Sequence, residues 1–270
     1  MGQINDLKDQ ALASLRGKWG SFVGLTFIYL LLYSIATFFV IYGAIFEGSS
    51  FTGLASAFSF IGSILMVLFI PIGYGYIVAY LHASRQDLPA DIGDLFYGYS
   101  NGQLRRVLGT YILMVLVVMA AAIPYIVFLV IMTMHGQLEE HNGFFMFLSL
   151  LLMIPVYVVA LAYAMFPFIL RDNPELSARE ILTKSRMMMQ GHKGELFILM
   201  LSFIGWGVLA LFTFGIGYLW LAPYMCMTFT KYYEQLRAEY EGVADGGTEQ
   251  PVVEEPASVA DEHASAEDSE

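Results

Sequence analysis

Residues 196–230 read LFILMLSFIGWGVLALFTFGIGYLWLAPYMCMTFT, a stretch of 35 residues without Asp, Glu, Lys or Arg. As one helix it would be about 52 Å long, which exceeds the hydrocarbon core of a bilayer at about 30 Å. The stretch must therefore reverse direction. Gly215-Ile216-Gly217 permits a tight turn, because its two glycines lack a Cβ atom and weaken the helix on both sides. The sequence predicts two helices here, over 196–214 and 218–238.

Four further uncharged runs precede this stretch, and each is long enough to cross a bilayer as a helix, which takes about 20 residues. The composition agrees: 57% of the 270 residues are hydrophobic and 14% are charged, whereas soluble domains are about 45–50% apolar and about a quarter charged. This argues against a soluble enzyme. We predict an all-α fold, a polytopic membrane bundle of six transmembrane helices, the first four over about 21–46, 54–81, 107–134 and 144–170.

The net charge of −11 comes from 13 Lys and Arg against 24 Asp and Glu. Ten of the acidic residues and none of the basic ones lie in residues 241–270, so the membrane domain, residues 1–240, is nearly neutral. The last 30 residues are rich in Gly, Pro, Ser and Glu and lack Phe, Trp and Tyr. Such a segment cannot bury enough apolar surface to offset its chain entropy. We expect residues 241–270 to be a disordered acidic cytoplasmic tail.

The thirteen cations all fall on one side of the predicted six-helix arrangement. They precede helix 1, lie between helices 2 and 3 or between helices 4 and 5, or follow the apolar part of helix 6. Cytoplasmic loops carry an excess of Lys and Arg, so we expect both termini in the cytoplasm and the protein in the plasma membrane. The single cysteine, Cys226, excludes a disulfide within the chain.

A short amphipathic segment precedes each of the three predicted hairpins. The second follows Asp91, a candidate N-cap, and the third opens with the capping box Ser177-Ala-Arg-Glu180. Three glycines end these segments, 85 and 89 residues apart. Two interpretations stay open: three copies of one unit, or a multi-spanning protein whose linkers are simply amphipathic. The glycines are Gly17, Gly102 and Gly191.

Several short pieces of the membrane domain, most of them in its C-terminal half, carry a resemblance to a known family. They are LRGKWG (15–20), Asp172-Asn-Pro174, Ser177-Ala-Arg-Glu180, Gly191-His-Lys193, Leu201-Ser-Phe-Ile-Gly-Trp206, Gly215-Ile-Gly217 and Pro223-Tyr224. With these pieces the chain resembles a bacterial integral membrane family described only as a domain of unknown function, DUF975. The resemblance extends over residues 1–240 and implies a fold and a membrane location but no reaction, because the family's activity is unknown. The family often has an acidic residue where Met200 stands and glycine where Val156 stands.

The sequence offers little catalytic chemistry. The apolar cores of the spans hold no Asp, Glu, Lys or Arg, which argues against a transporter with a carboxylate relay. No nucleophile elbow, phosphate loop or HExxH motif occurs, so we expect neither an enzyme nor a cofactor. His135, Glu139, Glu140 and His141 have the chemistry of zinc ligands. Such a cluster in an outer loop is usually solvated, and we expect no metal site.

The best polar candidates are four cations around the third amphipathic segment. Each would stabilise contact with an anionic head group by up to about 1 kcal/mol, although they would also satisfy the positive-inside rule without binding anything. We expect membrane lipids, and a membrane protein or a second copy of the chain, as partners, but no nucleic acid. The leading hypothesis is a non-enzymatic scaffold or accessory factor acting through lipids or partner proteins. The alternative is a transporter or permease-like protein for a small or lipid-like substrate. The four cations are Arg179, Lys184, Arg186 and Lys193.

Overall fold

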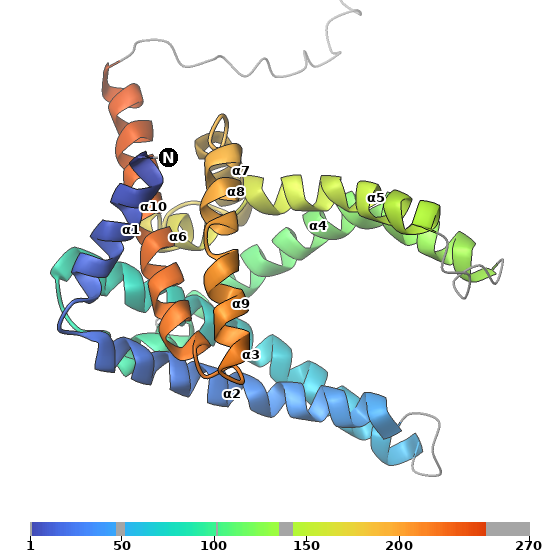
Figure 1. Cartoon of the computed structure of the whole chain (residues 1–270). Coiled ribbons are helices and arrows are strands. Elements are labelled where there is room, and N and C mark those ends of the chain that lie inside the picture. The colour runs from blue at the N-terminus through green and yellow to red at the C-terminus, as the bar shows by residue number, and fades with distance from the viewer. Residues whose placement is uncertain (1, 47–51, 101, 135–142, 247–270) are drawn as a thin grey trace, which may run out of the picture.

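A computed structural model describes residues 2–46, 52–100, 102–134 and 143–246 of the chain. Every element within these ranges is helical, which confirms the all-α prediction (Figure 1). In chain order the elements are α1 (Gly2–Leu15), α2 (Trp19–Phe46), α3 (Thr52–Gln86), the 3₁₀ helix η1 (Ile92–Tyr99), α4 (Gln103–Met134), α5 (Gly143–Ala162), α6 (Phe166–Asp172), α7 (Ala178–Met188), α8 (Lys193–Leu201), α9 (Ile204–Phe212) and α10 (Tyr218–Gly246).

The helices meet in a packed region that we call the hub, formed by residues 7–25, 72–107, 165–210 and 221–236. Two hairpins extend from it: the first arm, residues 26–71 of α2 and α3, and the second arm, residues 108–164 of α4 and α5 (Figure 1). The two arms diverge from each other as they leave the hub (Figure 1). The helices therefore do not form one closed bundle, and most large apolar side chains of the arms are exposed.

Five helical stretches in the described ranges are long and apolar enough to cross a membrane, which indicates a membrane-embedded protein. The last of them combines α8 and α9. Helix α10, which the sequence analysis takes as the sixth span, is not among them, because Lys231, Glu234 and Arg237 follow only 13 uncharged residues of this helix. The five stretches are Trp19–Phe46, Gly53–Gln86, Gln103–Met134, Gly143–Asp172 and Lys193–Phe212.

Two of the predicted continuous spans are interrupted. The helix predicted over 144–170 breaks after Ala162 and restarts as α6, where Pro167 lies in the first turn. A proline has no N–H to donate to the carbonyl four residues earlier, and its ring crowds that carbonyl. The helix predicted over 196–214 breaks at Ser202, whose hydroxyl donates to the carbonyl of Leu199 and competes with the helical pattern.

The predicted reversal at Gly215-Ile216-Gly217 is confirmed. Gly215 has φ +84°, a left-handed conformation that a glycine adopts without strain. Gly217 donates its N–H to the Thr213 hydroxyl at 2.7 Å and lies so close to Ala210 that a Cβ atom would approach the Ala210 Cα to 2.9 Å. The turn therefore needs both glycines, for different reasons. Beyond it, α10 continues to Gly246, past the predicted start of the tail, and residues 247–270 lie outside the described ranges.

The three short segments before the hairpins share a backbone feature. Gly17, Gly102 and Gly191 have φ of +77°, +76° and +84°, and they follow α1, η1 and α7 respectively. The Asp91 N-cap and the Ser177–Glu180 capping box both form as predicted. Three left-handed glycines at matching places support the interpretation of the chain as three related units, each a short helix followed by a hairpin.

Candidate functional site

Asp172, at the end of α6, is the centre of a charged junction in the hub. Both of its carboxylate oxygens accept from the Arg85 guanidinium, each at 2.7 Å, and Oδ2 also accepts from the Tyr233 hydroxyl at 2.8 Å and from Arg237 Nη1 at 3.0 Å. The Asp172 side chain is 8% exposed. Arg85 ends the first unit, Asp172 the second, and Tyr233 and Arg237 belong to the third. The junction therefore ties the three units together through one buried carboxylate.

Glu234 extends the junction on α10. Its carboxylate lies 3.4 Å from Arg85 Nε and 3.5 Å from Lys231 Nζ, and it accepts from the Ser84 hydroxyl at 3.0 Å. Arg85 is thus held between two carboxylates on different helices. The positive and negative groups of the junction are satisfied by one another, which is the arrangement that compensates for withdrawing charges from water.

His82 links the same helix ends to η1. Its Nε2 lies 3.1 Å from Nε and 2.9 Å from Nη2 of Arg171, and its Nδ1 lies 3.1 Å from Asp94 Oδ1. Since a guanidinium only donates, Nε2 must accept, and the ring proton then sits on Nδ1 and is donated to Asp94. The Arg171 guanidinium also lies 4.8 Å from the centre of the Tyr97 ring. His82 therefore links three segments, α3, η1 and α6.

The four predicted lipid-contact cations separate into two groups. Arg179 and Arg186 are exposed on α7, Lys193 at the start of α8 is half-buried, and no ion pair joins any of these three to another described residue. Lys184 instead donates to the Asn173 side chain at 2.9 Å, and Arg106 donates to the Asn173 carbonyl. Lys184 is therefore a structural residue of the hub, while Arg179 and Arg186 remain available to a ligand.

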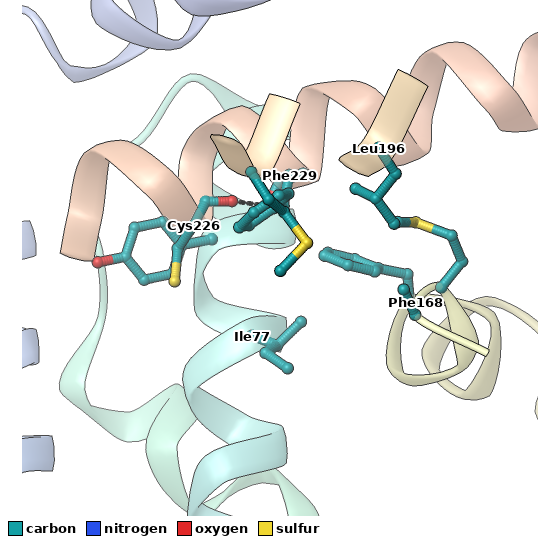
Figure 2. A pocket seen from close by; sticks show the side chains of 10 residues that line it. Ile77, Phe168, Leu196, Cys226 and Phe229 are labelled. Carbon is teal, nitrogen blue, oxygen red and sulfur yellow. Dashed lines mark hydrogen bonds between the residues drawn. The ribbon is translucent and has the colours of Figure 1, made fainter. Parts of the chain in front are cut away.

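A cavity of about 250 Å³ lies next to the junction, between α3, α6, α8 and α10 (Figure 2). Figure 2 shows Ile77 below it, Phe168 and Leu196 at one end, and Cys226 with Phe229 on α10. The lining is almost entirely apolar. Its volume exceeds that of the roughly 150 Å³ engineered cavity that takes up benzene. Its ten lining residues are Ile77, Tyr80, Ala164, Met165, Phe168, Leu196, Met200, Cys226, Phe229 and Thr230.

One aromatic pair separates the cavity from the junction. Phe168, in the cavity wall, stacks on Tyr233 with ring centres 4.8 Å apart and planes 15° apart. The hydroxyl of Tyr233 is the group that donates to Asp172. A shift of the Phe168 ring would therefore displace the Tyr233 ring and change the hydrogen bond from Tyr233 to Asp172.

A second hollow, of about 380 Å³, is lined by all three tryptophans of the chain, Trp19, Trp206 and Trp220. It lies between the start of α2 and the α9–α10 turn, with Thr213 and Gly217 also in its lining. On one side of this region Lys8 of α1 donates to the Ser202 carbonyl at 3.2 Å and lies 4.4 Å from the centre of the Phe203 ring. Burial lowers the pKa of the Lys8 ammonium, because the charged form loses hydration.

The charged junction is not predicted by the sequence. Its only signal was positional: Arg85 and Arg237 each lie fourteen residues after a proline, Pro71 and Pro223, at matching places in two units. That spacing could have suggested that the ends of the corresponding helices meet. The His135–His141 cluster considered for zinc lies outside the described ranges. Within the described ranges, no group of three or more His, Cys, Asp or Glu residues is placed to hold a metal ion.

The family model described as "Protein of unknown function (DUF975)" matches residues 1–240, the part that contains the hub and both arms. Neither a curated protein nor a solved structure matches the chain. The match covers most of the sequence and ends where the acidic tail begins. The chain belongs to the DUF975 family, whose function is unknown.

Proposed function

We propose that the protein is a non-enzymatic scaffold or accessory factor of the plasma membrane, which acts through lipids or partner proteins. The observation that carries this proposal is that the charged side chains of the hub pair with one another. Asp172, Arg85, Glu234 and Arg237 are committed to one another, and the cavity beside them is apolar. A hub built in this way holds helices in place, while the two arms present apolar surface to their surroundings.

The proposed topology has both termini in the cytoplasm and the two arms crossing the bilayer. The third hairpin, α8–α9 with α10, distinguishes six crossings from four. Six crossings, as the sequence predicts, would put the α9–α10 turn on the outer side and Trp19 on the cytoplasmic side. Trp19 and the turn residues Thr213 and Gly217 instead line the same hollow. This proximity favours a third hairpin that lies in the cytoplasmic leaflet without crossing the bilayer, with four crossings in all.

Contact with anionic lipids is the proposed role of Arg179 and Arg186. Both are exposed on α7, the opposite side of which packs into the hub through Ile181, Ser185 and Met188. An amphipathic helix that exposes arginines beside membrane-crossing helices is suited to bind head-group phosphates. Lys193 belongs to the same proposal, whereas Lys184 is engaged with Asn173.

The alternative function is a transporter or permease-like protein for a small or lipid-like substrate. The apolar cavity favours a lipid-like substrate over a polar one, because both hydroxyls in its lining are already hydrogen-bonded. Transport would require the cavity to open alternately toward two compartments. Protein-dependent, saturable transfer of a labelled lipid between the leaflets of a liposome would favour this alternative over the scaffold.

The decisive experiment is crosslinking and pull-down of the full chain from native membranes, with lipid analysis of the purified complex. The variant Arg179→Gln/Arg186→Gln is compared with Arg105→Gln, which removes an exposed cation at the start of α4. We expect a reproducible partner, or enrichment of anionic lipid, that the double variant reduces and the control retains. Recovery of the chain alone, with the lipid composition of the bulk membrane, would contradict the proposal.

A further inference from the structure

We infer that the cavity between α3, α6, α8 and α10 is a binding site for one hydrocarbon chain, supplied by the tail of a membrane lipid. This inference rests on the proposed membrane location and goes beyond it by assigning a site and a class of ligand. The inner wall is made of buried side chains from four elements, so it is a feature of the folded hub. These side chains are Tyr80, Met165, Phe168, Leu196 and Thr230.

The lining determines what the cavity can hold. The Tyr80 hydroxyl is hydrogen-bonded to Thr26 and Tyr76, at 3.2 and 3.1 Å, and the Thr230 hydroxyl donates to the Cys226 carbonyl at 2.9 Å. A polar ligand would lose its bonds to water and find few partners in the wall, which is costly. An aliphatic chain has no such bonds to lose and would fill space that otherwise leaves the surrounding side chains without contacts.

The rim determines where the ligand comes from. Met200 lines the cavity and is also 45% exposed, so its side chain reaches from the cavity to the surface of α8. On the same helix Phe197 and Ile198 are about half exposed, at 51% and 50%. This surface is apolar and belongs to a helical stretch able to lie in a bilayer. The cavity therefore opens onto lipid, and a lipid tail can enter without passing through water.

The site also has a route to the rest of the hub. Phe168 lines the cavity and stacks on Tyr233, and Tyr233 donates to Asp172. An occupied cavity would hold Phe168 against Tyr233, and an empty one would leave that ring free to move inward. Occupancy is thereby linked to the geometry of the charged junction that joins the three units.

The test uses the full chain purified from its own membranes in mild detergent, followed by a delipidating wash and native mass spectrometry. Ala164→Leu adds volume inside the cavity, and Ala160→Leu adds the same volume one turn earlier, on the exposed side of α5. Ile77→Phe fills the cavity from α3, in case substitution in the turn before α6 disturbs folding. We expect the wild-type chain and Ala160→Leu to retain one lipid per chain, and both filling variants to lose at least tenfold in occupancy.

Cys226 gives a second readout, since it is the chain's only thiol and lines the cavity. Complete removal of the bound lipid, under conditions harsher than the wash, should speed its reaction with a small apolar maleimide in the wild-type chain and have no such effect in Ala164→Leu. Chemical identification of the released lipid separates a phospholipid tail from a free fatty acid. Equal retention by all variants, or an empty wild-type cavity whose filling raises the melting temperature, would overturn the inference. A chain recovered from membranes but without retained lipid would leave the scaffold proposal standing and refute only this one.

Discussion

Arg85 and Asp172 face each other with two parallel hydrogen bonds, Nη1 to Oδ1 and Nη2 to Oδ2, each 2.7 Å long. They are 87 residues apart in the chain and end two helices of different units. Paired guanidinium–carboxylate bonds fix both distance and orientation, so this contact sets how α3 and α6 meet. Because Tyr233 and Arg237 use the same carboxylate, the position of α10 depends on it as well.

Asp172→Asn should therefore destabilise the hub. It leaves Arg85 and Arg237 without their shared partner, and we expect a loss of about 1–3 kcal/mol. The expected loss is smaller than the loss for breaking a fully buried ion pair. The reason is that the two arginine side chains are 33% and 39% exposed, so solvent screens their charges. Thermal unfolding in detergent is the measurement. Asp87→Asn is the control, because Asp87 pairs with Lys18 but its side chain is 87% exposed. Equal effects of the two substitutions would contradict the central role of Asp172.

Two glycines of α3, Gly73 and Gly75, should respond in opposite ways to alanine. A Cβ atom at Gly75 would collide with the backbone carbonyls of Asp94 and Leu95, so Gly75→Ala should push η1 away and cost about 1–3 kcal/mol. At Gly73 the nearest atom is the Tyr29 hydroxyl at 3.6 Å, an ordinary contact, so Gly73→Ala should stabilise the helix by about 0.5–1 kcal/mol. Melting temperatures of the two variants give the comparison, and the same direction of change in both would refute it.

The capping box of α7 should make that helix sensitive to acid. Hydrogen bonds from Ser177, whose backbone N–H lies 2.7 Å from the Glu180 carboxylate, lower the pKa of Glu180 below 4.5. A carboxyl whose pKa is lower in the folded state stabilises that state above its unfolded pKa, and the stabilisation is lost as the pH falls through the folded value. We expect the protection of α7 amides against hydrogen exchange, corrected for intrinsic exchange, to decrease as the pH is lowered below 4.5. Glu180→Gln should remove this pH dependence while leaving the protection of α10 unchanged.

The α9–α10 turn provides a direct test of the number of crossings. Phe214 is completely exposed at this turn, so Phe214→Cys in a Cys226→Ser background offers a single accessible thiol. With four crossings, an impermeant maleimide added to intact cells should not label Cys at this position. Arg179→Cys in the same background serves as the cytoplasmic control and should be labelled only after the cells are opened. Labelling of the turn in intact cells would establish six crossings instead.

Local signals in the sequence were reliable guides to local structure. The glycines of the α9–α10 turn, the Asp91 cap and the Ser177–Glu180 box were all predicted, because each depends on residues only a few positions apart. The breaks were not. Pro167 ends a span, yet the prolines at 71, 124, 155 and 223 lie inside continuous helices, so proline by itself does not tell the two cases apart.

The charged junction shows the corresponding limit for tertiary structure. In the sequence Arg85, Arg171 and Arg237 look alike, as cations at the ends of apolar runs. Whether each of them stays on the surface or is paired depends on helix ends that the fold brings together, although they lie 65 to 89 positions apart in the chain. For Lys184 the predicted lipid contact stays a prediction, and the fold gives it a hydrogen bond to the Asn173 side chain that the sequence did not indicate. Positive charge at the ends of apolar runs therefore does not predict which partner each cation has in the fold.

The two arms are anchored at one end only. Their bases are held by the hub, while their far halves diverge and share no packing with each other (Figure 1). Bilayers differ in thickness, and a helix pair accommodates such a difference by tilting. Here each helix pair can tilt about its base without disrupting any packing between the two arms. The same chain can thus adapt to thin and thick membranes, and any such tilt would be transmitted to the helix ends that meet at Asp172.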